Sequence, residues 1–203
     1  DDHMGSLASL QGVVQVDRVL LARDGLACSC ESCGKLRREA ESLVGKERVA
    51  GLSQGDKLRL GDFEFTCVWP VAFKDEGGNG DSLCFTVDTD FNRDGSREWR
   101  SLLVGDAEHE EVAEMLSAGL IEGVDVYKVG HHGSKNALTQ DQAAKLSPRV
   151  SLCSVGARNR YGHPAASTVE ALERAGSAVV RTDEHGDVAC RFAKDHISVK
   201  TLR

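Results

Sequence analysis

The sequence predicts a single α/β domain, spanning residues 1–203, in which a mixed β-sheet sandwich carries helices on its outside. Two patterns predict it. Between residues 56 and 106, apolar and polar residues alternate with the period of two that is typical of antiparallel strands. Between residues 108 and 181, strand-like and helix-like segments alternate, which is typical of parallel β-α-β units. A hydrophobic content of 40% is sufficient for one core in a chain of this length.

Three elements are expected at the start of the chain. Residues 5–14 have a helical pattern, and residues 16–22 (VDRVLLA) have the pattern of a buried strand. Residues 35–44 then form an amphipathic helix that follows a cysteine-rich loop.

Two hairpins are expected next. The segments KLRL and FEFTCVW flank Gly61-Asp62, which is a hairpin signal. SLCFTVDTD and WRSLLVGD flank the polar loop at residues 91–98. This half of the chain is therefore predicted to be antiparallel.

The second half supplies alternating helices and strands. Two helix starts carry capping boxes, Thr139 with Gln142 and Ser167 with Glu170. The expected helices are 108–118, 139–146 and 167–175, the expected strands are 125–129, 150–155 and 178–181, and a meander of 188–192 and 197–201 closes the chain.

The composition argues against a surface that binds nucleic acid everywhere. The formal net charge is -7, whereas non-specific affinity for nucleic acid comes mainly from Lys and Arg that face phosphates. Aromatic residues make up only 5% of the chain, which is few for a base-stacking platform. Any polyanion must therefore be bound at a local cluster of positive charge. The sequence also contains no run of about 18 apolar residues that would span a membrane.

The chain has seven cysteines of two kinds. Three of them, Cys28, Cys30 and Cys33, are closely spaced in a loop. A closed zinc site needs four ligands, and no fourth is obvious nearby, so zinc binding, reduced thiols and a strained local disulfide all stay open. The others lie in strand-like runs and are interpreted as small core residues: Cys67, Cys84, Cys153 and Cys190.

Three apolar runs in the second half end in Gly followed by Asp or His: LLVGDAEHEE, DVYKVGHHGSK and SVGARNRYGHP. A buried strand that ends in this way brings a ligand to the rim of a sheet. We therefore predict that Asp106, His131, His132 and His163 form half of a metal site.

Asp2 and His3 are candidate ligands for the other half. The string His-Met-Gly-Ser is also one that cloning leaves behind, but the sequence continues from it without a break into helix and strand patterns. Carboxylates combined with imidazoles, without a thiol, favour Zn or Mn over copper. Such a divalent ion acidifies a bound water and stabilises a phosphoryl centre.

Each candidate also has a purely structural interpretation. Asp106 is a good N-cap for the helix that follows it. His163 precedes Pro164 at a helix start and is compatible with a turn. His131 and His132 would point to opposite faces of a strand, so at most one of them would fill the core.

The order of DDHMGSL, LLVGDAE, DVYKVGHHGSK, SVGARNRYGHP and VVRTDEHGDV resembles the metallo-β-lactamase-fold domain that ends DNA-internalisation competence proteins of the ComEC type. The resemblance covers nearly the whole chain. It implies a metallo-β-lactamase-like αββα sandwich, here lacking its first strands. It also implies a larger parent protein in the cell membrane, whose channel is a partner of this segment.

The resemblance assigns roles to the candidate ligands. Asp2 and His3 match the last two positions of the His-x-His-x-Asp-His signature, and Asp106 matches the bridging Asp. His132 is then the last metal ligand, and His131 faces the phosphate.

The resemblance also predicts a role for the polar residues around the histidines. Lys128 and His163 are expected to act in catalysis with His131, because basic groups near a metal stabilise charge on a phosphoryl group. The alternative for the basic residues is a solvated loop. The expected substrate-binding residues are Ser134, Lys135, Arg158, Asn159, Arg160 and Tyr161.

Two features depart from the family pattern. The first two signature positions would lie upstream of Asp1. A third-motif His is expected before SLCFTV, but residues 77–82 contain none, which leaves Asn79, Asp81 and Ser82 as candidate oxygen ligands.

The function implied is metal-dependent phosphodiester hydrolysis, by a nuclease that degrades the non-imported, single-stranded DNA during natural transformation. One alternative is a small-molecule phosphodiesterase of the same fold. The other is a non-catalytic module that guides DNA or docks a partner and whose metal site is degraded.

Overall fold

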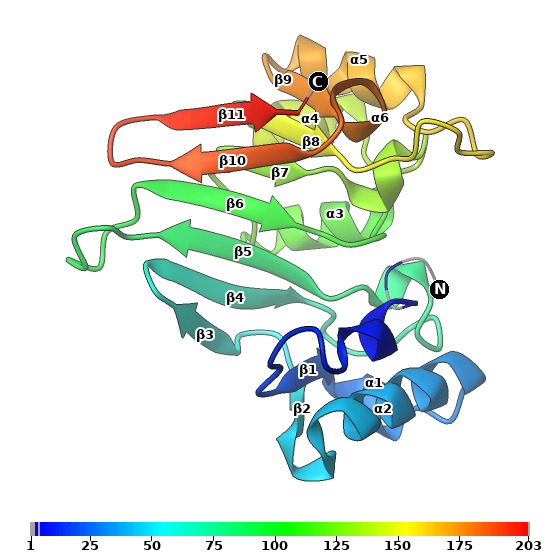
Figure 1. The fold of residues 1–203 in the computed structure, drawn as a ribbon. Helices are drawn as coiled ribbons and strands as arrows, with labels where there is room; N and C mark the ends of the chain where they lie inside the picture. Colours follow the sequence, from blue (N-terminus) through cyan, green and yellow to red (C-terminus); the bar gives the residue numbers. More distant parts are fainter. Residues whose placement is uncertain (1–2, 4, 203) are drawn as a thin grey trace.

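The computed structural model describes residues 3 and 5–202. At its centre is a seven-stranded sheet with the order β3-β4-β5-β6-β7-β8-β9 (Figure 1). Neighbours from β3 to β6 are antiparallel, and neighbours from β6 to β9 are parallel. The strands are β3 (Lys57–Leu60), β4 (Phe63–Trp69), β5 (Cys84–Thr89), β6 (Trp99–Leu103), β7 (Val126–Lys128), β8 (Val150–Cys153) and β9 (Ala178–Arg181).

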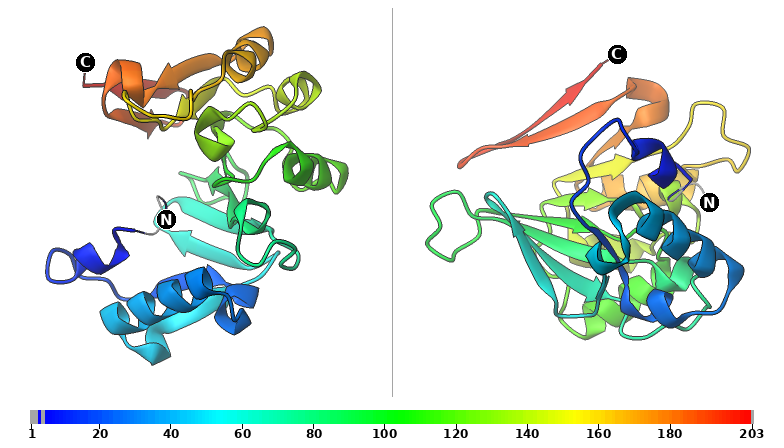
Figure 2. Two further views of the ribbon diagram at one scale, coloured as in Figure 1. Left: turned by 90° about the vertical axis from the view of Figure 1, so that its right-hand side faces the viewer. Right: turned by 60° about the horizontal axis from the view of Figure 1, so that its bottom comes forward.

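Helices cover one face of this sheet and a hairpin covers the other (Figures 1 and 2). On the hairpin side, Trp99 Nε1 donates a hydrogen bond of 2.6 Å to the Ala193 carbonyl, and the rings of Phe63 and Phe192 meet edge to face at 6.0 Å. The elements are α3 (His109–Ser117), α4 (Gln140–Leu146) and α5 (Ala166–Arg174) on one side, and β10 (Val188–Phe192) and β11 (Ile197–Thr201) on the other, with α6 (Thr182–His185) leading into the hairpin.

The core lies between the sheet and the three helices. Leu102 and Tyr127 of the sheet and Met115 and Leu172 of the helices are fully buried there. Burying a large apolar side chain contributes about 1.5–3 kcal/mol, so this layer is the main source of stability. It fixes the strand ends from which the site residues extend.

A smaller N-terminal unit packs beside β3 and β4 (Figure 1). In it, strand β1 (Val19–Ala22) pairs in parallel with β2 (Val49–Leu52). The unit also contains η1 (Leu7–Leu10), α1 (Arg23–Ala27), α2 (Glu31–Val44) and η2 (Lys46–Arg48).

The predicted mixed α/β class is confirmed, with antiparallel strands first and β-α-β alternation second. The helix expected over residues 5–14 is wrong, since only Leu7–Leu10 forms a 3-10 turn. The capping box at Thr139 is confirmed, whereas α5 begins after Ala165, so Ser167 lies inside the helix and is not its cap. Across the described part of the chain, no helix is both long enough and apolar enough to cross a bilayer.

Candidate metal centre

The candidate ligands lie at one edge of the sheet because β6, β7 and β8 run parallel. The carboxyl ends of parallel strands meet at the same edge, which is where sheets of this kind place their sites. Asp106 follows β6, His131 and His132 follow β7, and Ser154 follows β8. His3, from the start of the chain, reaches the same edge.

Three ligand atoms converge there. His3 Nε2 lies 2.9 Å from Asp106 Oδ1 and 3.2 Å from His132 Nε2, and His132 Nε2 lies 3.7 Å from Asp106 Oδ1. Ligands bound tetrahedrally at about 2.0–2.2 Å from one ion would lie about 3.4 Å apart. Asp106 Oδ1 is buried, and no described residue gives it a hydrogen bond of normal geometry, which is costly for a carboxylate unless a cation is bound. These three residues therefore fit a divalent ion.

The imidazole of His132 is oriented for this role. Its Nδ1 lies 2.7 Å from the Ser154 carbonyl oxygen, which can only accept a hydrogen bond. Nδ1 therefore donates, and Nε2 presents its lone pair towards Asp106 and His3. A backbone carbonyl behind a ligating His is a common way to fix its tautomer.

His131 and His132 do not lie on a strand, which corrects the sequence interpretation. They form a tight turn, η4 (Gly130–Gly133), with φ of 43° and 53°. Two successive non-glycine residues in the left-handed region cost about 1–3 kcal/mol each. Because of this turn, both side chains reach the same edge of the sheet instead of opposite faces.

His131 is held by a residue that the sequence analysis missed. Its Nδ1 lies 2.7 Å from Glu108 Oε1 and 3.4 Å from Asn79 Nδ2. Glu108 is the N-cap of α3 and shares a capping box with Glu111. Asp106 is therefore not the helix cap, and its carboxylate faces the ligand group instead. Glu is an unusual N-cap, which is why the sequence pattern did not reveal it.

His163 lies next to this pair. Its ring centroid is 5.6 Å from that of His131, and Tyr161 stacks on its other side at 5.8 Å. Burial lowers the pKa of His163, and the neighbouring His131 and His132 lower it further. The imidazole is thus neutral at pH 7 and available to accept a proton.

Two of the predicted substrate-binding residues, Ser134 and Asn159, make hydrogen bonds within their own loops. Ser134 is buried, and its hydroxyl accepts a hydrogen bond from the Asn136 N–H. The Asn159 amide makes its hydrogen bonds with the backbone of its own loop, at Gly156, Tyr161 and His163. These hydrogen bonds stabilise the two loops.

The remaining basic loop residues are exposed. Lys135, Arg158 and Arg160 are solvent-exposed, and Tyr161 is 83% exposed. Lys128 differs from them, because burial lowers its pKa and its Nζ donates to the Val129 carbonyl.

In the segment that lacks the third-motif His, the Asp81 and Ser82 side chains accept hydrogen bonds from backbone N–H groups. Asp81, which is 4% exposed, accepts hydrogen bonds from the backbone N–H groups of Lys74, Asp75 and Gly77. Ser82 Oγ accepts from the Asp106 N–H, so it positions the Asp106 loop. Asp2, the remaining predicted ligand, lies outside the described residues.

A cavity of about 720 Å³ adjoins the site on the side of Glu108 and Asn79. Its lining is strongly acidic: Asp75, Glu108, Glu110, Glu111 and Glu114, with Lys74 as the only Lys or Arg among its lining residues. Such a surface repels phosphate.

Comparison with known proteins supports the family predicted from the motifs. The chain is 30% identical over 191 residues to ComE operon protein 3 of Bacillus subtilis (strain 168), which covers 94% of the chain and 23% of that protein. The predicted resemblance to ComEC-type competence proteins is confirmed. The chain is also 35% identical over 102 residues to Recombination protein 2 of Haemophilus influenzae, covering 50% of the chain and 13% of that protein. It thus spans less than a quarter of the length of either relative.

No family model matches the chain. Among solved structures, a mutant of CmlA beta-hydroxylase aligns with a TM-score of 0.47 and 12% identity, covering 81% of this chain and 38% of that one.

Proposed function

We propose that this chain is the metallo-β-lactamase-like domain of a DNA-uptake protein in the cell membrane, and that it hydrolyses phosphodiester bonds in the DNA strand that is not imported. The convergence of His3, Asp106 and His132 carries the proposal, because their three ligand atoms lie 2.9–3.7 Å apart, close to tetrahedral spacing. One of the three is the buried Asp106 Oδ1, to which the described residues supply no hydrogen bond of normal geometry. The names of the two relatives, a ComE operon protein and a recombination protein, support DNA as the substrate.

His3, Asp106 and His132 would hold a divalent ion, Zn or Mn. Such an ion supplies Lewis acidity and lowers the pKa of water that it binds. The Ser154 carbonyl keeps His132 in the ligating tautomer, and the Ser82 hydroxyl keeps the Asp106 loop in place.

His131 and His163 are the proposed proton-transfer and phosphate-facing groups. Glu108 accepts a hydrogen bond from His131 Nδ1, which fixes the ring, and Nε2 is the atom that would face a phosphate oxygen. His163 is neutral at pH 7 because burial and the other histidines disfavour its charged form. A neutral imidazole beside the reacting group accepts a proton and later returns it to the leaving oxygen.

The distribution of charged residues around the proposed metal centre favours one direction of approach for DNA. The acidic cavity lies on the Glu108 side, whereas Arg158 and Arg160 are exposed on the His163 side. A single strand would therefore lie along the Arg158–Arg160 loop, with its phosphate near His131 and His163. A local patch of this kind binds DNA despite the net charge of -7.

The test is Mn- or Zn-dependent cleavage of single-stranded DNA by this protein, compared with its Asp106→Ala and Asp195→Ala variants. Asp195 is an exposed carboxylate in the β10–β11 turn and serves as the matched control. We expect metal-dependent cleavage that falls by at least about 100-fold in Asp106→Ala and is unchanged in Asp195→Ala.

Two outcomes would favour the alternative functions. Faster turnover of a chromogenic phosphodiester than of DNA, with no competition between the two, would favour a small-molecule phosphodiesterase. A metal-free, inactive protein that still binds DNA would favour a guiding module. The absence of a His from residues 77–82, where the third motif is expected, is the observation in favour of that module.

A further inference from the structure

We propose that Cys28, Cys30 and Cys33 form a second metal site, which binds zinc through three thiolates and fastens the N-terminal unit to the loop at residues 73–82. This proposal does not depend on the metal centre or on hydrolysis. It assigns a function to the one cysteine cluster whose role the sequence leaves open.

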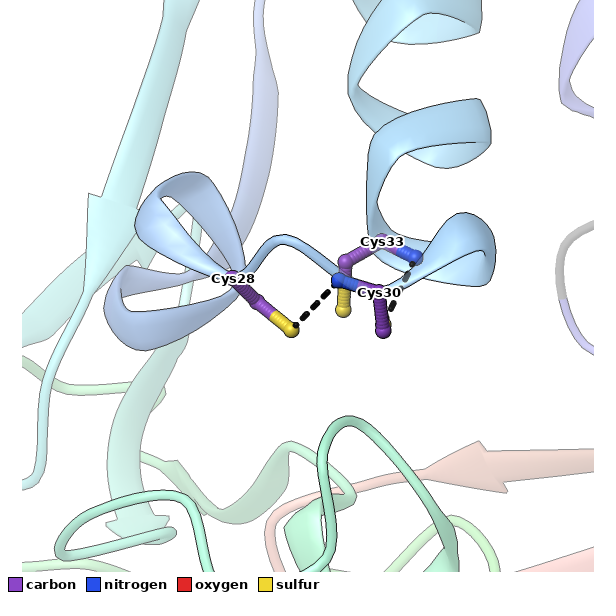
Figure 3. A group of neighbouring side chains, drawn as sticks. All are labelled: Cys28, Cys30 and Cys33. Carbon is purple, nitrogen blue, oxygen red and sulfur yellow. Dashed lines mark hydrogen bonds between the residues drawn. The ribbon is translucent and has the colours of Figure 1, made fainter.

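The three sulfur atoms are close enough to share an ion. All lie within 4.8 Å of one another, and all three residues are half-buried (Figure 3). Thiolates bound tetrahedrally to zinc at about 2.3 Å would be about 3.8 Å apart. The cluster would need to contract by about 1 Å at most, which side-chain rotation can supply.

The backbone around the cluster is already arranged for thiolates. Cys30 is the N-cap of α2, and its Sγ accepts a hydrogen bond of 3.4 Å from the Cys33 N–H. Cys28 Sγ accepts one of 3.4 Å from the Cys30 N–H (Figure 3). Donors of this kind hold ligating sulfur atoms in position, and the helix N-terminus favours the negative charge that they carry.

A disulfide would pair only two of the three cysteines, whereas a metal ion uses all three. Three thiolates at this separation repel one another strongly unless a cation lies among them. Of the common protein metals, zinc best combines thiolate ligands with a lack of redox chemistry, whereas manganese prefers oxygen.

A cavity of about 480 Å³ lies beside the cysteine cluster and has room for a fourth ligand. Cys28 and Cys30 line this cavity together with Asp24 and Glu76, among others. Asp24 Oδ2 already accepts a hydrogen bond from the Phe73 N–H, so a water molecule or the Glu76 carboxylate would be the fourth ligand. Such a site, with three thiolates and one oxygen, is tetrahedral and complete.

The loop at residues 73–82 presses against the thiols. A Cβ added to Gly77 would lie 2.7 Å from Cys33 Sγ, and φ of Gly77 is +84°, so only glycine fits there. The same loop contains Asp81, whose carboxylate accepts a hydrogen bond from the Gly77 N–H, and Ser82, whose hydroxyl accepts one from the Asp106 N–H. A zinc ion among the thiols would therefore stabilise the loop that supports the metal centre.

The test is titration of the reduced protein with Co²⁺, a spectroscopic substitute for zinc whose bonds to thiolates absorb in the near ultraviolet. We expect one equivalent to produce this absorption, and zinc to displace the Co²⁺. Cys28→Ser, Cys30→Ser and Cys33→Ser should each weaken binding at least about tenfold. Cys190→Ser, which changes a half-buried cysteine in β10, and Asp106→Ala should both leave the absorption unchanged.

A second measurement guards against variants that fail to fold. In the unaltered protein, zinc should protect Cys28, Cys30 and Cys33 from alkylation, as mapped by mass spectrometry, and leave the reactivity of Cys190 unchanged. The proposal is overturned if the reduced protein gives no thiolate absorption, if the absorption persists in all three Ser variants, or if zinc protects none of the three cysteines.

Discussion

Two glycines allow the left-handed turn that carries His131 and His132. A Cβ at Gly130 would lie 2.6 Å from the Ala107 carbonyl oxygen, and one at Gly133 would lie 2.6 Å from Pro164 Cβ. Both glycines are buried, so neither neighbour can move away easily. The turn therefore requires glycine at positions 130 and 133 as well as His131 and His132 between them.

We expect Gly130→Ala to destabilise the protein by about 1–3 kcal/mol, because the added methyl group overlaps backbone in a close-packed region. Urea unfolding measures this change. Gly156→Ala is the matched control, since a Cβ there meets nothing within 4 Å. Equal free energies of unfolding for the two variants would mean that the turn tolerates a side chain.

We expect the pKa of His163 to lie below its ordinary value of 6.5, first because of burial and then because of His131 and His132. The unfolded chain then binds a proton more tightly than the folded one, so stability falls as the pH drops through about 6.5. NMR titration of the metal-free protein measures the pKa. His131→Asn should raise the pKa of His163, and a pKa at or above 6.5 in the unaltered protein contradicts the expectation.

At the residue scale, the convergence of the candidate ligands was easier to predict from the sequence than the contacts of their neighbours. Asp106 and His132 end apolar runs, so their place at a strand edge was visible in the pattern, and the structure brings His3 to them. Ser134 and Asn159 are also polar and lie near the histidines in the sequence, but their side chains form hydrogen bonds with the backbone of their own loops. These hydrogen bonds depend on the conformation of the loops, which residue type and spacing do not determine.

At the scale of elements, the loop between β8 and α5 carries the exposed Arg158 and Arg160, and neither of them lines the acidic cavity. We expect Arg158→Ala together with Arg160→Ala to weaken single-stranded DNA binding. If both contact phosphates, the slope of log affinity against log salt should fall by about 1.4. Fluorescence anisotropy at several salt concentrations measures it.

Arg191→Ala with Lys194→Ala is the control for this pair, since these exposed residues lie in or beside the hairpin on the other face of the sheet. These two substitutions should leave the affinity for single-stranded DNA and its salt dependence unchanged. If the two double variants behave alike, the Arg158–Arg160 loop has no particular role in binding.

The sequence predicted the helices and strands that pack against another element, and it failed for a segment that buries little apolar surface. The strands of the central sheet and α3 to α5 follow their apolar periods closely. Residues 5–14 have a helical pattern too, but Val13 is 75% exposed and Val14 is 53% exposed, so little apolar surface is buried there. A short helix without a packed face is marginal in water, which is why only one turn forms.

At the scale of the whole molecule, the change from antiparallel to parallel strands determines where the site lies. Parallel order from β6 to β9 brings three loops to one edge, and His3 crosses to that edge from the start of the chain. The sequence predicted the change of order. The parallel β1–β2 pair was missed, because every residue of VAGL is only half-buried and its pattern has no period.

The central claim is that His3, Asp106 and His132 bind one divalent ion. Electron paramagnetic resonance of Mn²⁺ tests it most directly, because Mn²⁺ prefers oxygen and imidazole ligands over the thiols of the cysteine cluster. We predict that the unaltered chain binds Mn²⁺, that His132→Ala binds it at least about tenfold more weakly, and that His196→Ala, which changes an exposed His, binds it normally. Equal Mn²⁺ affinity in His132→Ala and the unaltered chain would contradict the account.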